Sequence, residues 1–317
     1  MTRLVTLMMI VGTMVALPIA GAQEAAPLQA EWELVVEHAQ FGPRDTAEPF
    51  IFDGRMWLSN GYFNGNVLYP DLWVAEPGAV NWRCVLEQTP YWPYAEMVVH
   101  EGKIYAIKGD VWTSTDGEHW EQILAETPFG VRGYGELLVH DGKIWQIGGS
   151  DVWTTTDGVN WTQVAADLPW GNRSAAAILS FDGKLWVIAG SVSIPNNPPE
   201  AGYETMTTFN DVWCSEDGVT WERVVEHAPW APRMWVVGEV YRNHMFIIGG
   251  YSNREEFNFA EVWYSADGVN WYSLPVPEGF SGRHEVTPYV FDDSLWIVAG
   301  NTWPLVNDVW RIDILQQ

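Results

Sequence analysis

One short segment recurs along the chain and constrains its fold more than any other feature. Its full copies are Asp110 to Trp120, Asp151 to Trp161, Asp211 to Trp221 and Glu261 to Trp271; a looser copy runs from Asp71 to Trp82 and a shortened one from Asp308 to Trp310. In each full copy, a Val-Trp strand start, an Asp-Gly turn and a second Trp predict a β-hairpin. We expect the two Trp residues of a hairpin to face each other across its strands.

A second hairpin precedes each copy. Its members share a two-residue turn followed by an apolar strand with an aromatic residue at a fixed place: 52–57, 100–105, 140–145, 181–186, 241–246 and 291–296. The strand then ends in glycine or alanine-glycine, which permits close backbone approach. The Val-Trp tryptophans, at positions 73, 112, 153, 213, 263 and 310, are spaced as expected for blades of four strands.

The ends of the chain complement each other. The last unit stops after its third strand, and Glu31 to Val36 resembles the missing fourth strand. The sequence therefore predicts an all-β, six-bladed β-propeller in a single domain, residues 23–317, with four-stranded antiparallel blades and a ring closed by the N-terminal strand. The predicted blades are residues 43–87, 90–126, 128–167, 169–227, 229–276, and 280–315 together with 31–36.

Residues 1–22 have the pattern of a secretory signal peptide. Arg3 provides the positive charge, an apolar run from Leu4 to Ala16 follows, and Ala20-Gly21-Ala22 is a small-residue cleavage site. The apolar run is short for a membrane span, although an uncleaved anchor is the alternative. We expect a secreted or periplasmic protein that is cleaved near Ala22 and works as a monomer without membrane contact.

Charge and cysteine content narrow the possible partners. The formal net charge of −25 opposes binding to nucleic acids and anionic membranes. Cys84 and Cys214 are the only cysteines, so the fold does not rest on disulfides, and we expect free thiols. The sequence shows no metal-ligand spacing and no phosphate-binding loop, so we expect neither metal nor cofactor.

The glycine pairs after the apolar strands, the Asp-Val-Trp segment and the later Trp resemble the Kelch repeat family, whose propellers include the galactose oxidase central domain. The hairpins around Asp116, Asp157, Asp217 and Asp267 also look like the Asp-box of sialidase-type propellers. Asp commonly caps its own turn, so we expect these residues to be structural. Periplasmic propellers that resemble this chain include sialic acid epimerases, which use Arg and carboxylate groups. The Arg-Ile-Pro signature of sialidases is absent.

An aromatic-x-x-Arg pattern recurs in the links between units. Its arginines are Arg44, Arg132, Arg173, Arg233 and Arg283, with Tyr94 in the equivalent place of the second unit. The structural interpretation is a guanidinium group that bridges adjacent blades. The functional interpretation is a ring of arginines that binds a carboxylate or sulfate at the channel mouth.

Residues that break the repeat are the better site candidates. Counting by twos from the Arg position follows one face of the innermost strand. This face carries Glu48, Glu96, Tyr134, Glu136, Trp235, Glu239 and Glu285, and only Ala175 and Ala177 in the fourth unit. Glu96, Glu136, Glu285 and His284 are candidate catalytic residues. Tyr134 and Trp235 are candidate stacking platforms for a ligand. A hydrated channel whose polar groups satisfy one another is the alternative.

Loops over the channel differ in length. The segments Ser191 to Asn210, Tyr251 to Ala260, Tyr62 to Pro70 and Asn301 to Asn307 are long, whereas the second and third units have almost none. We therefore expect a cup that is walled by four units and open over two. The favoured function is a binding module for a glycan, a small acidic sugar or an extracellular protein. The alternative is a sugar-active enzyme, either an epimerase or mutarotase or a glycosidase such as a sialidase.

Overall fold

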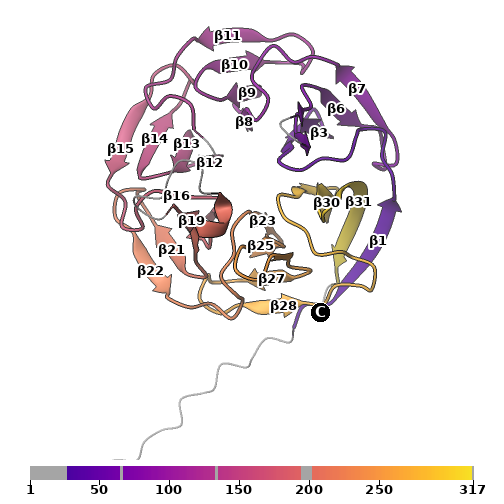
Figure 1. The fold of residues 1–317 in the computed structure, drawn as a ribbon. Coiled ribbons are helices and arrows are strands. Elements are labelled where there is room, and N and C mark those ends of the chain that lie inside the picture. Colours follow the sequence, from indigo (N-terminus) through magenta and orange to yellow (C-terminus); the bar gives the residue numbers. More distant parts are fainter. Residues whose placement is uncertain (1–26, 65–66, 133–134, 194–201, 316–317) are drawn as a thin grey trace, which may run out of the picture.

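The computed structural model describes residues 27–64, 67–132, 135–193 and 202–315 (Figure 1). The expected signal peptide lies outside these residues. Within them, the chain forms six four-stranded antiparallel sheets arranged around a common centre. The prediction of an all-β propeller with four-stranded antiparallel units is therefore confirmed. The described part of the chain contains no helix with the length and apolar character needed to cross a bilayer.

In sheets 1 to 5, strands that follow one another along the chain pair antiparallel, joined by tight turns or by longer loops over the centre. Sheet 1 contains β2 (Glu48–Phe52), β3 (Arg55–Ser59), β6 (Leu72–Ala75) and β7 (Trp82–Leu86). Sheet 2 contains β8 (Glu96–His100), β9 (Lys103–Ile107), β10 (Val111–Ser114) and β11 (Glu121–Leu124). Sheet 3 contains β12 (Glu136–His140), β13 (Lys143–Gly148), β14 (Asp151–Thr155) and β15 (Thr162–Ala166).

The remaining sheets follow the same plan. Sheet 4 contains β17 (Ala177–Phe181), β18 (Lys184–Ile188), β21 (Val212–Ser215) and β22 (Glu222–Val225). Sheet 5 contains β23 (Val237–Tyr241), β24 (His244–Ile248), β27 (Val262–Ser265) and β28 (Tyr272–Leu274). Sheet 6 contains β29 (Thr287–Phe291), β30 (Ser294–Asn301), β31 (Leu305–Ile314) and β1 (Ala30–Val36).

Strand β1 supplies the outer strand of sheet 6. It pairs antiparallel with β31, so that residues from the two ends of the chain lie side by side (Figure 1). The Trp32 ring lies 5.1 Å from that of Phe280 and 6.3 Å from that of Trp310. Trp32 thus takes the place that the second Trp of the hairpin has in the other sheets.

The innermost strands β2, β8, β12, β17, β23 and β29 contact one another in that cyclic order, and β29 returns to β2. Among the described residues, six clusters of buried apolar side chains fill the spaces between neighbouring sheets, including the space between sheets 6 and 1. This distributed core holds the sheets together, since burying one large aromatic side chain contributes on the order of 2–3 kcal/mol.

The Asp-Gly turns connect neighbouring sheets as well as strands. In the turn of sheet 3, Asp157 Oδ1 accepts hydrogen bonds from the backbone N–H groups of Val159 and Asn160, at 2.9 and 2.8 Å. Gly158 follows with φ of +76° and packs against the Tyr105 ring of sheet 2. The equivalent glycines Gly117, Gly218 and Gly268 pack against Trp57, Trp145 and Trp186. This geometry supports the structural role expected for the turn aspartates.

The two tryptophans of a hairpin do not face each other, and that prediction is wrong. Trp153 lies opposite Gln163, and Trp161 precedes strand β15. The aromatic residue of the preceding link takes the space beside both: the Phe129 ring lies 5.8 Å from that of Trp153 and 4.9 Å from that of Trp161. The same arrangement recurs around Phe41, Trp170, Trp230 and Phe280.

Four of the connections over the centre carry further short strands. These are β4 (Tyr62–Asn64) with β5 (Val67–Leu68), β19 (Ser191–Val192) with β20 (Thr207–Thr208) and β16 (Arg173–Ser174), and β25 (Tyr251–Ser252) with β26 (Phe257–Asn258), together with the extended ends of β30 and β31. A short 3-10 helix, η1 (Tyr203–Thr205), lies in the loop of sheet 4. Sheets 2 and 3 lack such additions in the described residues, which agrees with the expected uneven cup.

Candidate functional site

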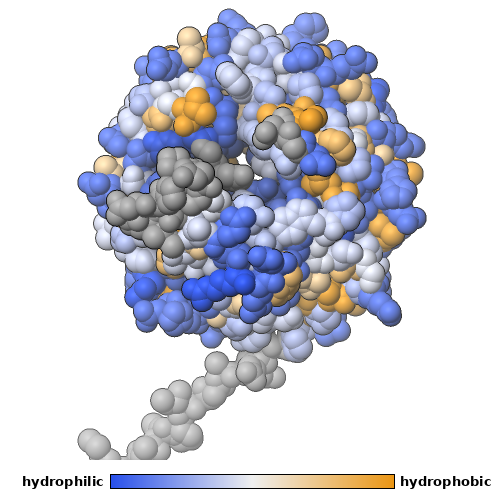
Figure 2. All heavy atoms as spheres, in the orientation of Figure 1, coloured by the Kyte–Doolittle hydropathy of each residue, from blue (hydrophilic) through white to orange (hydrophobic). Residues whose placement is uncertain are grey.

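A cavity of about 560 Å³ lies among the innermost strands. Figure 2 shows the surface hollowed near the centre of the face that carries the long loops. The wall contains apolar side chains from β12, β17 and β23 and five glutamates: Glu48, Glu96, Glu136, Glu239 and Glu285. A volume of this size accommodates a small organic molecule.

Three of the glutamates occupy the first position of neighbouring innermost strands. Glu48 begins β2, Glu96 begins β8 and Glu136 begins β12. An innermost strand that starts at the same height in each sheet places these carboxyl groups close together on the cavity wall. The identical position explains why they form one cluster despite their separation in sequence.

The cluster holds its protons more tightly than free glutamate does. Burial, and then the charge of Glu96, raise the pKa of Glu48 to about 8. Burial raises the pKa of Glu96 to about 7, although Lys108 and Arg132 oppose this shift. Part of the cluster is therefore protonated near neutral pH, where such groups can donate and accept protons.

The pKa values of two further glutamates are also raised. The Glu136 side chain is exposed toward the cavity but surrounded by protein, and burial together with the Glu48 and Glu96 charges raises its pKa well above the ordinary value. Glu239, in the middle of β23, has its pKa raised to about 7 by burial, while its Oε1 accepts a hydrogen bond from the Val240 N–H. Carboxyl groups that are partly protonated form hydrogen bonds as donors and as acceptors.

An aromatic cluster stands at one side of the mouth. The Trp235 ring stacks on His284 at 4.9 Å and on Tyr251 at 5.4 Å, each with an interplanar angle of 26°. The Tyr203 ring approaches Trp235 edge-on at 5.1 Å. Trp303, which is 48% exposed, packs against Tyr251 and His284. Trp235 also lines the cavity, where an aromatic ring can pack against an apolar face of a ligand.

The backbone at the mouth is unusual. Thr46, Ala175, Trp235 and Glu285 each have φ between 46° and 56°, although none is glycine. Their backbones form a chain of hydrogen bonds: Trp235 N donates to Ala175 O, Glu285 N to Trp235 O and Thr46 N to Glu285 O, at 3.0, 3.0 and 3.3 Å. Strained backbone that the surroundings hold in place is typical of ligand sites. This chain fixes the positions from which Trp235 and Glu285 enter the cavity.

The repeated arginines form ion pairs within their own sheets. Arg173 Nη1 lies 2.5 Å from Asp211 Oδ1, and its Nη2 lies 3.0 Å from Asp211 Oδ2. Equivalent pairs are Arg44 with Asp71, Arg132 with Asp151, Arg233 with Glu261 and Arg283 with Asp308. The guanidinium groups therefore do not bridge adjacent sheets as predicted, because the acidic residue that starts each Val-Trp strand lies closer.

The arginine residues nevertheless connect sheets through their backbones. Gly190 N of sheet 4 donates to Arg233 O, and Gly250 N of sheet 5 donates to Arg283 O, both at 3.0 Å. Arg44, Arg233 and Arg283 are at most 1% exposed. The geometry thus favours the structural interpretation for them and for Arg173, which is 3% exposed. The sequence contains a signal for this pairing, because each unit with such an arginine also has an acidic residue at the start of its Val-Trp strand. In the second unit Tyr94 replaces the arginine, and Oδ1 of the equivalent Asp110 has no hydrogen-bond partner among the described residues.

Two members of the expected ring line the cavity. Arg132 lies close enough to Glu96 to lower its pKa, and Tyr94 takes the place of the missing arginine. Burial, and then the charges of Asp45 and Glu285, raise the pKa of the Tyr94 hydroxyl, so this group is a neutral donor. Tyr134 lies outside the described residues. The cavity therefore combines five glutamates with Lys108 and Arg132 as its basic groups among the described lining residues.

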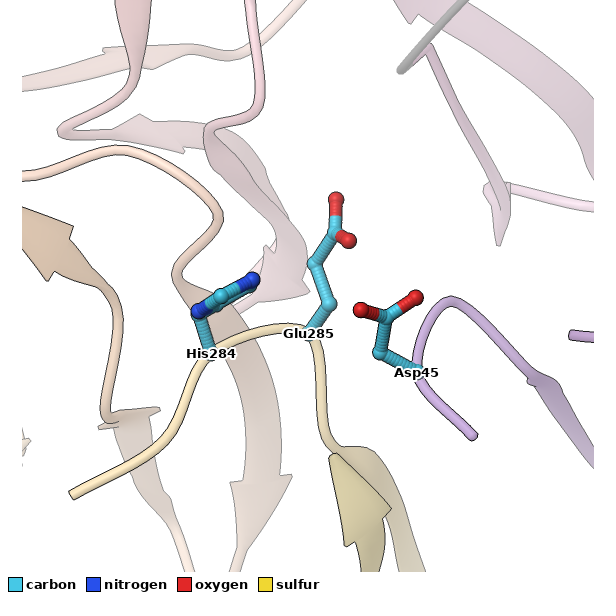
Figure 3. A group of neighbouring side chains, drawn as sticks. All are labelled: Asp45, His284 and Glu285. Carbon is cyan, nitrogen blue, oxygen red and sulfur yellow. The ribbon is translucent and has the colours of Figure 1, made fainter. Parts of the chain in front are cut away.

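Asp45, His284 and Glu285 meet beside the aromatic cluster (Figure 3). One donor atom from each lies within 4.8 Å of the others. His284 is 3% exposed, and burial lowers its pKa to about 3, so it is neutral. Burial also raises the pKa of Asp45 to about 6. Counting by twos from Arg44 passes over Asp45, which is why the sequence analysis missed it; the adjacent Arg-Asp and Arg-His-Glu segments were the available signal.

Comparison with known proteins supports the fold. The model of the DUF6242 beta propeller domain matches residues 81–315. A solved structure described as "Structure of YjhT" aligns with a TM-score of 0.68 at 13% sequence identity, covering 89% of this chain and 100% of that chain. At this identity the likeness concerns the fold alone. A search of curated proteins finds no match.

Proposed function

We propose that this chain, which belongs to the DUF6242 beta propeller domain family, binds a sugar without negative charge in the cavity among its innermost strands. The cavity itself carries the proposal. It has the volume of a small-molecule site, an aromatic platform at Trp235 and five glutamate side chains that can bond to hydroxyl groups.

The electrostatics favour a neutral or amino sugar over an acidic one. Five glutamates oppose Lys108 and Arg132 in the lining, and Arg132 is itself paired with Asp151. Four of the five repeated arginines are buried in ion pairs. A carboxylate ligand would meet those glutamates that are ionised in a poorly solvated place, which is unfavourable. In this proposal the acidic sugar expected from the sequence is therefore the less favoured ligand.

A sugar-active enzyme is the second candidate, and the pKa values favour it. Glu48 and Glu96 have pKa values of about 8 and 7, close to the pH at which a general acid or base works best. In this proposal, Glu96 or Glu136 moves a proton to or from a ligand held on Trp235, and Glu285 fixes a hydroxyl group. Which of Glu96 and Glu136 moves the proton depends on the substrate.

The remaining features of the proposal concern context. We propose that the six sheets are the blades of one closed ring, on the support of the cyclic contacts between innermost strands. Kelch-type kinship, secretion through residues 1–22 and a monomeric state are part of the same proposal. An extracellular protein that contacts the long loops of sheets 4 and 5 is the alternative partner.

A calorimetric titration series tests the proposal. Neutral, amino and acidic monosaccharides and disaccharides are titrated into the full chain near neutral pH. Binding of a neutral or amino sugar that is weakened at least about tenfold by Trp235→Ala, by loss of a contact worth about 1.4 kcal/mol, supports it. Preference for uronic or sialic acids contradicts the electrostatic argument, and silence across the panel contradicts the sugar site. Turnover of a bound sugar that is lost in Glu96→Gln, with binding retained, selects the enzyme.

A further inference from the structure

We propose that Asp45, His284 and Glu285 bind a divalent transition-metal ion at the mouth of the cavity. Their side chains come from two links between sheets. Asp45 lies in the link that leads into β2 of sheet 1, and His284 and Glu285 lie in the link that leads into β29 of sheet 6. Figure 3 shows the three side chains gathered at this junction. One nitrogen and two oxygen atoms within 4.8 Å of one another form a mixed ligand set of the kind that proteins use for such ions.

The hydrogen bond of His284 uses Nδ1 and leaves Nε2 available to a metal ion. Its Nδ1 lies 2.6 Å from Asn258 Oδ1, and Asn258 Nδ2 donates to Asn301 O at 2.8 Å. Since this amide uses its nitrogen on a carbonyl group, its oxygen accepts the proton of Nδ1. Nε2 therefore carries a lone pair and, among the described residues, has no hydrogen-bond partner. A metal-binding histidine is usually oriented by such a bond to its other nitrogen.

The carboxyl groups of Asp45 and Glu285 have one donor, the Thr46 hydroxyl group, between them. Thr46 Oγ1 lies 2.9 Å from Asp45 Oδ1 and 2.7 Å from Glu285 Oε2, but a hydroxyl group has one proton. Asn301 Nδ2 donates to the other oxygen of Asp45 at 2.8 Å. Among the described residues, these two donors serve two of the four carboxylate oxygens of Asp45 and Glu285, next to a histidine that is 3% exposed. A bound cation supplies the positive charge that this arrangement lacks.

The ligand types indicate the class of ion. Imidazole nitrogen favours zinc and its transition-metal neighbours, whereas calcium and magnesium prefer oxygen ligands alone. Three protein ligands leave at least one coordination position open. Since Glu285 also lines the cavity, that position faces the space where a ligand would lie. The site therefore suits Zn²⁺ or Mn²⁺ with an exchangeable water.

Metal titration of the full chain tests this inference without any sugar. After treatment with EDTA, the chain is titrated with Zn²⁺, Mn²⁺ and Ca²⁺ near neutral pH, and bound metal is counted after dialysis. We expect one ion per chain, with Zn²⁺ or Mn²⁺ bound more tightly than Ca²⁺. Asp45→Asn and Glu285→Gln should lose this binding. Asn258→Ala, which removes the hydrogen bond that orients His284 together with the bond to Asn301 O, should weaken it by about 10–100-fold.

Glu255→Gln is the matched control, because it removes an exposed carboxylate from the loop that carries Asn258. It should bind metal like the unchanged chain. Co²⁺ gives a second readout, since its visible absorption changes when an imidazole coordinates, and His284→Gln should abolish that change. Melting curves in EDTA show whether each variant is folded. If a variant of a ligand residue does not fold, metal binding by Asn258→Ala and the Co²⁺ spectrum of the unchanged chain test the inference instead.

Absence of stoichiometric Zn²⁺ or Mn²⁺ binding would overturn the inference, as would equal binding by Asp45→Asn. Preference for Ca²⁺ with no effect of His284→Gln would overturn the assignment of imidazole as a ligand. If no metal ion binds, a proton shared between Asp45 and Glu285 explains the missing donor. Failure of sugar binding leaves these outcomes unchanged, so the two proposals are tested separately.

Discussion

Trp235 and His284 stack at the mouth of the cavity, with ring centroids 4.9 Å apart and planes inclined by 26°. The contact joins the link into sheet 5 to the link into sheet 6. It places an aromatic face, a neutral imidazole and the Glu285 carboxyl group within one wall. The ligand platform and the Asp45, His284 and Glu285 group are therefore neighbouring parts of one mouth.

Replacement of Trp235 by alanine should weaken binding of a neutral or amino sugar by about tenfold, because a good stacking contact contributes about 1.4 kcal/mol. Calorimetry measures the effect. Trp92→Ala is the control, since Trp92 is 63% exposed and is not part of the cavity lining. Equal weakening by both replacements would show that Trp235 is not the platform.

Replacement of Arg173 by methionine should reduce the free energy of unfolding by about 3–5 kcal/mol, because it leaves a buried aspartate without its partner. Arg173 and Asp211 are 3% and 6% exposed. The comparison is Arg223→Met, which breaks an exposed pair with Glu226 and should cost about 1 kcal/mol or less. Urea unfolding measures both. Similar small losses would contradict the structural role of the repeated arginines.

Replacement of Gly268 by alanine should destabilise the chain more than Gly183→Ala. Both glycines have positive φ, +76° and +69°, so either alanine carries strain on the order of 1–2 kcal/mol. A β-carbon at Gly268 would also overlap the ring of Trp186, whereas nothing lies within 4 Å of one at Gly183. Thermal unfolding should show a lower Tm for Gly268→Ala. Equal Tm values would mean that the turn does not press on the neighbouring sheet.

Glu239 should make the folded state less stable as the pH rises. Its pKa is about 7 when folded, against 4.5 ordinarily, so the folded chain binds the extra proton between these values. The associated stability is complete below 4.5 and is lost as the pH rises through about 7. Glu239→Gln should therefore raise Tm at about pH 8, by about 2–4 °C per kcal/mol, and change it little in acid. Parallel Tm curves from acid to about pH 8 would contradict the burial of this carboxyl group.

Much of the fold could be predicted from the sequence because each copy of the repeat contains the same turn and strand signals. The Asp-Gly turns and the Val-Trp strands recur, and Trp32 marks the strand that joins β31. The packing of Phe129 beside Trp153 and Trp161 could not be predicted in this way, since an alternating pattern within one hairpin says nothing about a link that packs against it.

The site was predictable only in part. Glu48, Glu96 and Glu136 follow from strand periodicity, because they begin equivalent strands. Asp45 did not follow, because Thr46 and its equivalents adopt positive φ and interrupt the alternation on which the counting by twos relies. The arginines were recognised as a set, but their acidic partners lie 19 to 38 residues away and are brought close only by the folded sheet.

The central claim is that the ligand lies in the cavity among the innermost strands. Ala175 lines this cavity and already has a β-carbon at positive φ, so Ala175→Trp fills the mouth without changing any charge. The control is Val219→Trp, at a position that is 53% exposed on a turn away from the cavity lining. Calorimetry with the sugar that binds the unchanged chain should show binding lost in Ala175→Trp and kept in Val219→Trp. Undiminished binding by a folded Ala175→Trp chain would place the site elsewhere.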